Sequence, residues 1–120
     1  MPTDKTGATA TVTDNPAAQR YEIATDDQTA GFTQYRDRTA PDGSAERIFF
    51  HTEVAEEFGG RGLGTILVQE ALDDTRSNGR IIVGVCPLVA AFLTKHPDYA
   101  EAAHPVTPEV LAWLKKALNN

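Results

Sequence analysis

A glycine-rich segment stands where the chain changes from one pattern of apolar residues to another. The segment is Gly59-Gly60-Arg61-Gly62-Leu63-Gly64, and the residues from Arg47 to Val54 before it predict a strand. After it, Leu63, Ile66, Leu67, Ala71 and Leu72 recur at helical spacing. Because glycine accepts backbone dihedral angles that other residues avoid, the segment predicts a tight loop from a strand into an amphipathic helix.

The residues before this strand predict two more strands. Residues 20–25 alternate polar and apolar side chains with period two, and residues 31–37 do so again after the turn at 26–28. A second turn over 39–44 contains Pro41 and Gly43. We expect the three strands to form an antiparallel sheet.

The residues after the first helix predict one more strand and two more helices. Asn78-Gly79 is a suitable helix end, and Ile81 to Cys86 is continuously apolar, as in a strand covered on both faces. Pro87 and Pro108 each suit the first position of a helix, and Pro97 ends the first of these two helices. The expected order is β-β-β-α-β-α-α, a mixed α+β fold.

Composition limits the number of domains and the class of partner. The length of 120 residues suits one domain; residues 1–18 are rich in small and polar side chains and predict a flexible tail, which leaves 19–120 as the domain. One cysteine excludes an internal disulfide and favours a reducing compartment. The net charge of −6 argues against nucleic acid, and no apolar run approaches the ~20 residues of a membrane span. We therefore expect a soluble cytoplasmic protein.

The glycine-rich loop is a candidate phosphate site. The first amides of a helix have no partner within the helix and carry partial positive charge, so they suit a phosphate or diphosphate. Arg61 could add a charged contact. A Walker loop would require a lysine before Thr65, and a dinucleotide loop would follow the first strand of a parallel unit; neither fits. The alternative is a flexible turn that only caps the helix.

The order of these motifs resembles the acetyl-CoA-binding segment of the GNAT acetyltransferases. Glu53-Val54, Gly60-Arg61-Gly62-Leu63-Gly64, Leu67-Val68 and Ala71-Leu72 carry the likeness. Cys86-Pro87-Leu88-Val89-Ala90-Ala91-Phe92 and Lys95-His96-Pro97-Asp98-Tyr99 look like the small single-domain proteins of the YjdJ type. The resemblance covers roughly residues 19–100.

This resemblance implies a GNAT-like mixed sheet, an antiparallel meander followed by a splayed parallel strand, with acetyl-CoA as co-substrate. The pantetheine arm would lie in the gap between the two splayed strands, lined by Glu53, Val54 and Ala55. Phe92 and Lys95 would lie near the arm or the nucleotide. The diphosphate would be held by the amides of the loop and the helix start, namely Gly59, Gly60, Arg61, Gly62, Leu63, Gly64 and Thr65. Gly59 stands where the superfamily usually has Gln or Arg.

At two positions where the resemblance would place catalytic residues, this sequence has other residue types. Leu93 stands where many members have a tyrosine acid, and Arg47 stands near the position of a carboxylate base. Cys86 is the leading replacement, because it precedes a helix N-terminus, where a thiolate is stabilised; it would accept the acetyl group or protonate the leaving thiolate. The alternative for Cys86 is a small buried apolar residue.

His51 and Glu53, on the strand before the loop, are the candidates for a base. His96 is better explained by the helix end, where a cation complements the dipole, and the scattered His and Cys residues lack metal-ligand spacing. We therefore expect no metal.

Three functions remain open: an acetyl-CoA-dependent N-acetyltransferase acting on a small-molecule or protein amine, an acyl-CoA binding or sensing protein with little turnover, and a thiol-based regulator. We expect no nucleic acid or membrane partner and a monomer or weak dimer.

Overall fold

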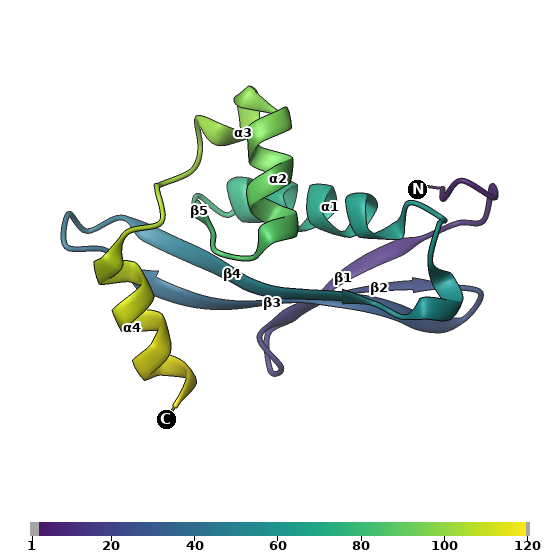
Figure 1. The fold of residues 1–120 in the computed structure, drawn as a ribbon, viewed down its shortest axis with the longest axis horizontal. Helices are drawn as coiled ribbons and strands as arrows, with labels where there is room; N and C mark the ends of the chain where they lie inside the picture. Colours follow the sequence, from purple (N-terminus) through teal and green to yellow (C-terminus); the bar gives the residue numbers. More distant parts are fainter. Residues whose placement is uncertain (1–2, 120) are drawn as a thin grey trace.

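The computed structural model describes residues 3–119 and contains one five-stranded sheet in the order β1-β2-β3-β4-β5 (Figure 1). The strands β1 (Thr11–Asn15), β2 (Arg20–Thr25), β3 (Gln28–Thr39) and β4 (Ala45–Val54) are antiparallel, and β5 (Ile81–Gly84) pairs with β4 in parallel. The predicted mixed α+β sheet, a meander followed by a parallel strand, is confirmed.

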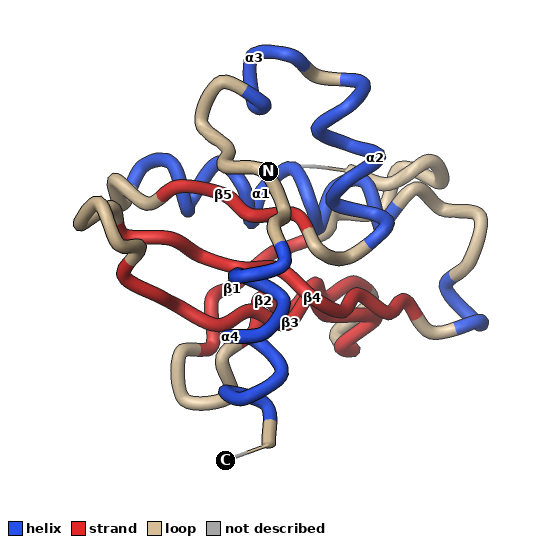
Figure 2. The backbone as a smooth tube through the Cα atoms, turned by 60° about the vertical axis from the view of Figure 1, so that its left-hand side comes forward, coloured by secondary structure: helices blue, strands red, loops and turns tan. Residues whose placement is uncertain are grey.

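The helices divide between the two faces of this sheet. The helices α1 (Leu63–Ser77), α2 (Pro87–Lys95) and the short α3 (Pro97–Ala100) lie over one face, and α4 (Pro108–Leu118) lies at the other face beside the first half of β4 (Figures 1 and 2). A single 3₁₀ turn, η1 (Glu56–Phe58), leads from β4 into the glycine-rich loop. Within residues 3–119, no helix is both long and apolar enough to cross a membrane.

The expected flexible tail over residues 1–18 differs from the structure. Residues 11–15 form β1, which pairs with β2 along its whole length, and Ala10 is fully buried. The sequence pattern missed this strand because it is at the sheet edge, where backbone pairing suffices and few apolar side chains are needed. Residues 1 and 2 lie outside the described residues.

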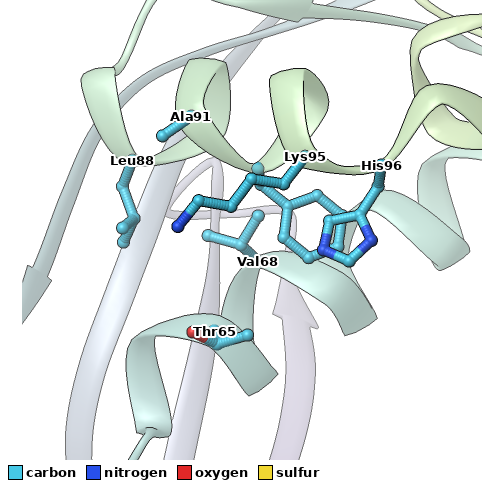
Figure 3. A pocket seen from close by; sticks show the side chains of 7 residues that line it. Thr65, Val68, Leu88, Ala91, Lys95 and His96 are labelled. Carbon is cyan, nitrogen blue, oxygen red and sulfur yellow. The ribbon is translucent and has the colours of Figure 1, made fainter.

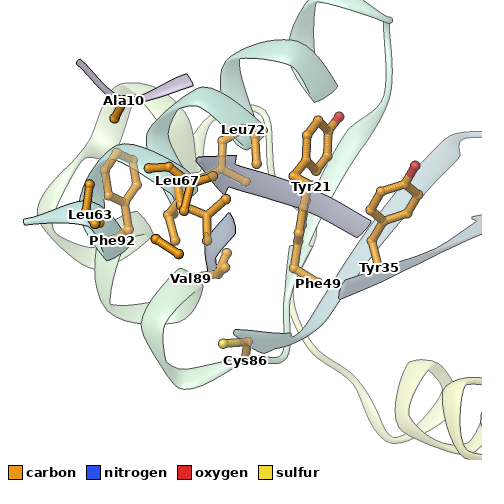
Figure 4. Packing of buried hydrophobic residues seen from close by; sticks show 14 of the residues in the cluster. Ala10, Tyr21, Tyr35, Phe49, Leu63, Leu67, Leu72, Cys86, Val89 and Phe92 are labelled. Atoms are coloured by element: carbon orange, nitrogen blue, oxygen red, sulfur yellow. The ribbon is translucent and has the colours of Figure 1, made fainter. Parts of the chain in front are cut away.

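The core lies between the sheet and the face of α1 that the sequence predicts (Figure 4). Phe49 of β4 packs with Tyr21 of β2 and Tyr35 of β3, with ring centroids 6.1 Å from each. Leu67 and Leu72 of α1 are fully buried against them. Burying such side chains stabilises each by about 1.5–3 kcal/mol, so α1 is anchored over β4 and its N-terminal end is fixed in place.

The feature that matters most for function is the parting of β4 and β5. Their pairing runs from Glu46 and Ile81 to Phe49 and Gly84, where it stops. The carbonyl of Phe49 accepts hydrogen bonds from the amides of both Val85 (3.0 Å) and Cys86 (2.9 Å), and the chain then turns into α2. β4 continues to Val54 alone on this side, which confirms the expected gap between the strands.

A β-bulge in β4 lies at the same point. His51 is opposite Gln34 and Phe49 is opposite Tyr35, so that Phe50 is the extra residue on β4. A bulge bends its strand and increases the local twist. The bulge therefore helps turn the end of β4 away from β5.

Candidate functional site

The glycine-rich loop presents a run of free amides at the start of α1. Gly62 is the N-cap of α1 with φ of 79°, and no side chain caps the helix. Among the described residues, no protein acceptor receives a hydrogen bond from the backbone amides of Gly60, Arg61, Gly62, Leu63, Gly64 or Thr65. Uncapped amides of this kind suit a phosphate group.

The backbone amide of Gly59 is not free, in contrast to the expectation. Its amide donates to the carbonyl of Glu56 at 2.9 Å and closes the η1 turn. The donor set at the loop is therefore 60–65 rather than 59–65.

Arg61 does not point its charge at this set of amides. Its guanidinium pairs with Asp4 (Nε to Oδ2, 2.5 Å) and Asp26 (Nη1 to Oδ2, 3.0 Å), and it lies over the ring of Phe58. The expected phosphate contact from the Arg61 side chain is therefore not formed by this arrangement. The sequence could not reveal this, because both carboxylates come from segments distant in the chain.

Only some residues at the end of β4 have backbone groups that face the gap, because the others are hydrogen-bonded to β3. The amide of Ala55 donates to the carbonyl of Ala30 on β3, and the Ala55 carbonyl accepts from Phe58, so both its backbone groups are occupied. In an antiparallel ladder the bonded positions alternate, and therefore Glu53 also faces β3. Thr52 and Val54 turn their backbone groups toward the gap. Of the three residues expected to line the arm, only Val54 turns its backbone groups toward the gap.

A hollow of about 140 Å³ lies between α1 and α2, beside the loop (Figure 3). Its walls include Thr65 of α1 and Leu88 of α2, and Lys95 extends across it. The Phe92 ring is stacked on that of His96 with centroids 4.1 Å apart. The full lining is Thr65, Val68, Leu88, Ala91, Phe92, Lys95 and His96. The structure thus brings Phe92 and Lys95 together next to the free amides.

Cys86 lies at the N-cap of α2, at the closed end of the gap, and is 4% exposed. Its Sγ is 3.2 Å from Oγ1 of Thr52 on β4, and Oγ1 of Thr52 is 2.8 Å from Oγ1 of Thr33 on β3. The thiol therefore has a polar partner and belongs to a chain of hydroxyl groups that crosses two strands.

His51 and Glu53 lie on the opposite face of β4 from Cys86. The His51 Nε2 and a Glu53 carboxylate oxygen are 3.0 Å apart, both side chains are largely exposed, and the His51 ring lies near that of Phe32. Successive side chains on a strand point to opposite faces, so Thr52 between them turns toward Cys86 while they turn away. The three candidates form two groups, a thiol on one face and an imidazole–carboxylate pair on the other.

Sequence reasoning missed Thr52, Thr33 and Leu88. The alternation along β4 puts Thr52 on the same face as Val54, which is a signal the sequence does contain; the partner Thr33 depends on strand register, which it does not. Within residues 3–119, no cluster of three or more His, Cys, Asp or Glu side chains is placed to hold a metal ion.

Comparison with known proteins adds a family to this geometry. The model of the GCN5-related N-acetyl-transferase family matches residues 20–102. No curated protein matches the sequence.

Among solved structures, a GCN5-like protein from Staphylococcus aureus is similar, with a TM-score of 0.57 and 20% identity over 82% of this chain and 91% of that one. A ribosomal-protein-alanine N-acetyltransferase from Brucella melitensis has a TM-score of 0.54 and 19% identity, over 73% and 62% of the two chains. An integron cassette protein from Vibrio cholerae has a TM-score of 0.50 and 16% identity, over 75% and 56%. At these identities the structures establish the fold alone.

Proposed function

Because the chain belongs to the GCN5-related N-acetyltransferase family, we propose that it transfers the acetyl group of acetyl-CoA to an amine. The narrower likeness to the YjdJ type stays a prediction. The acceptor is a small-molecule or a protein amine, and the surplus of acidic residues favours a cationic one.

One observation carries this proposal: the free amides of residues 60–65 stand at one end of the gap between β4 and β5, and Cys86 stands at the other. The amides suit the diphosphate of coenzyme A, and the free backbone groups of Thr52 and Val54 suit the amide groups of the pantetheine arm. A thioester that follows this line would end near Cys86. Phe92 and Lys95 would contact the nucleotide or the part of the pantetheine arm next to the diphosphate.

The geometry supports two routes for the acetyl group. In direct transfer the amine nitrogen attacks the thioester carbonyl, a C–N bond forms as the C–S bond breaks, and the Cys86 thiol gives its proton to the leaving thiolate. In the covalent route the Cys86 thiolate attacks the thioester, and coenzyme A leaves as its thiolate, which takes a proton from water. The amine then attacks the acetyl-cysteine, and the Cys86 thiolate is released as the C–N bond forms. In both routes the amine loses a proton. The candidate bases His51 and Glu53 lie on the other face of β4 from Cys86, so the proton passes to water rather than directly to the imidazole.

Leu93 favours a second function, the binding of acyl-CoA with little turnover. It stands at the position of the usual tyrosine acid. A methyl group built on Gly84 would lie 3.1 Å from Leu93 Cδ1, so this side chain packs α2 onto β5. A protein without that acid would bind acyl-CoA with little turnover.

The test combines binding and turnover. Isothermal titration with acetyl-CoA should show binding, and a panel of amines should reveal release of free coenzyme A thiol. The Cys86→Ala variant should keep its affinity and lose most of its turnover, while Cys86→Ser, which retains a proton donor, should keep turnover only by the direct route. Intact mass after incubation with acetyl-CoA should show one added acetyl group if the route is covalent.

Binding without release of coenzyme A for any amine would favour the acyl-CoA binding protein. Absence of binding would overturn both functions and favour a thiol-based regulator.

A further inference from the structure

The first described residues of the chain are docked onto the glycine-rich loop. Asp4 is central to this contact: its carboxylate accepts hydrogen bonds from the amides of Thr6 (2.8 Å) and Ala8 (3.0 Å) and from the Thr6 hydroxyl (2.6 Å), in addition to the ion pair with Arg61. The Asp4 side chain is fully buried. The amide of Lys5 donates to the carbonyl of Arg61 at 2.8 Å. Figure 1 shows this segment beside the N-terminal end of α1. Residues 3–9, here called the N-terminal latch, are therefore held in one position against the loop.

The latch places the side chain of Lys5 across Gly62. A methyl group built on Gly62 would lie 3.3 Å from Cε and 3.4 Å from Cγ of Lys5. The stem of the lysine thus lies against the residue that caps α1. Within the described residues the ammonium group of Lys5 has no ion-pair partner.

The other charged side chains at the loop do not supply a net positive charge for an anion. Arg61, the cation within the glycine-rich loop, stands between Asp4 and Asp26, so the three groups together carry one net negative charge. Gly59, at the start of the loop, supplies no side chain. An anion at the amides of residues 60–65 therefore needs positive charge from elsewhere.

Two hollows flank the start of α1, and Thr65 lines both. The hollow between α1 and α2 contains Lys95. The second, of about 310 Å³, is formed by Thr3, Asp4, Lys5, Arg61, Gly62, Thr65 and Ile66. A group bound beside Thr65 would therefore have Lys95 at one hollow and Lys5 at the other.

We propose that Lys5, positioned by the latch, binds the diphosphate of coenzyme A, opposite Lys95. This inference rests on the proposed function, because it assigns a further contact in the same site. The diphosphate is the relevant group, rather than the 3′-phosphate, because Lys5 lies on Gly62, the N-cap residue, in the middle of the run of free amides. The N-terminal latch is then a part of the binding site that is built by the tertiary fold.

The test is isothermal titration of the full chain with coenzyme A, 3′-dephospho-coenzyme A and pantetheine. Lys5→Met keeps the stem over Gly62 and removes the charge. It should weaken binding of both nucleotide ligands equally, about five- to tenfold, and leave pantetheine, which has no phosphate, unchanged. Lys5→Arg should restore most of the affinity. Lys116→Met, an exposed lysine on α4, is the matched control and should bind like the wild type.

The outcomes separate the two proposals. If the wild type does not bind coenzyme A, the proposed function fails and this inference fails with it. If the wild type binds and Lys5→Met binds equally well, or if pantetheine is weakened to the same extent, the assignment of Lys5 is wrong while the proposed function stands. A loss restricted to coenzyme A, with 3′-dephospho-coenzyme A unaffected, would also overturn contact with the diphosphate.

Discussion

Across the gap between β4 and β5, Cys86 and Thr52 bring a thiol and a hydroxyl to within 3.2 Å of each other. Thr52 in turn lies 2.8 Å from Thr33, a fully buried hydroxyl on β3. A buried polar atom without a partner is costly, and a chain of partners fixes its orientation. Thr52 is therefore a positioning residue for the Cys86 thiol.

Replacing Thr52 by valine should lower kcat for acetyl transfer about three- to tenfold, since one hydrogen bond of about 0.5–1.5 kcal/mol is lost, and should leave KM for acetyl-CoA nearly unchanged. Initial rates at several acetyl-CoA concentrations measure this split. Thr13→Val, on the exposed edge strand β1, is the control. A rise in KM without a fall in kcat would contradict the positioning role.

Two glycines with positive φ, one in the glycine-rich loop and one in a turn far from it, allow a controlled comparison. Gly60 has φ of 77° and Gly43, in the turn between β3 and β4, has φ of 90°; a Cβ on either would meet nothing within 4 Å. An alanine at each position should cost about 1–2 kcal/mol of stability through the backbone alone. Only Gly60→Ala should also weaken coenzyme A binding, about tenfold, because relief of its strain turns the free amides away. Urea unfolding and isothermal titration measure the two effects, and equal affinity in both variants would exclude the loop as the phosphate site.

The latch should be released in acid at a pH set by Asp4. The hydrogen bond from Thr6 lowers the pKa of Asp4 to about 2; Arg61 and the amides of Thr6 and Ala8 act in the same direction, and burial opposes them. Because the folded pKa lies below the ordinary value near 4, the carboxylate contributes stability above pH 4 that is lost as the pH falls through about 2. Carbon-detected NMR of the Asp4 carboxyl should show this midpoint, together with a shift of the Lys5 amide. A midpoint near 4 would mean that the latch is not docked in solution.

In alkali the sensitive group is Tyr21. Burial and the hydrogen bond to Asp74 (2.6 Å) raise its pKa to about 12, while Arg47 donates to its hydroxyl at 2.7 Å. Since the folded pKa lies above the ordinary value near 10, the stability from this group is complete below pH 10 and is lost as the pH rises through about 12. The difference in unfolding free energy between wild type and Tyr21→Phe should therefore shrink between pH 10 and 12. A constant difference across this range would show that Tyr21 does not titrate with unfolding.

The fold was largely predictable because its signals are local. Strand alternation over 20–25, the helical stripe of α1 and the apolar run of β5 are each set by neighbouring residues, and all three elements form as expected. The edge strand β1 was not predictable in this way, since its few apolar residues resemble those of a tail and its stability comes from pairing with β2. The short helix α3 was missed too, because Pro97, which ends α2, also begins it.

The candidate site was predictable in outline and not in detail. The loop amides and Cys86 were expected from residue types and order. Gly59, Arg61 and Ala55 were expected to contact the ligand, but their polar groups are already bonded to other groups of the protein. His51 and Cys86 were both candidates for the chemistry, and the bulge at Phe50 and the strand alternation put them on opposite faces.

The sequence by itself determined the order of the elements from β2 onward, apart from the short α3, and the flexible glycine backbone at the start of α1, because propensity, periodicity and capping act over a few residues. Only the tertiary structure decided which groups are free to bind. Asp4 and Asp26, far apart in the chain, neutralise Arg61, and the docking of the latch brings Lys5 to Gly62. Charge pairing and hydrogen bonding act through space, so the cation available to a phosphate is known only once distant segments have met.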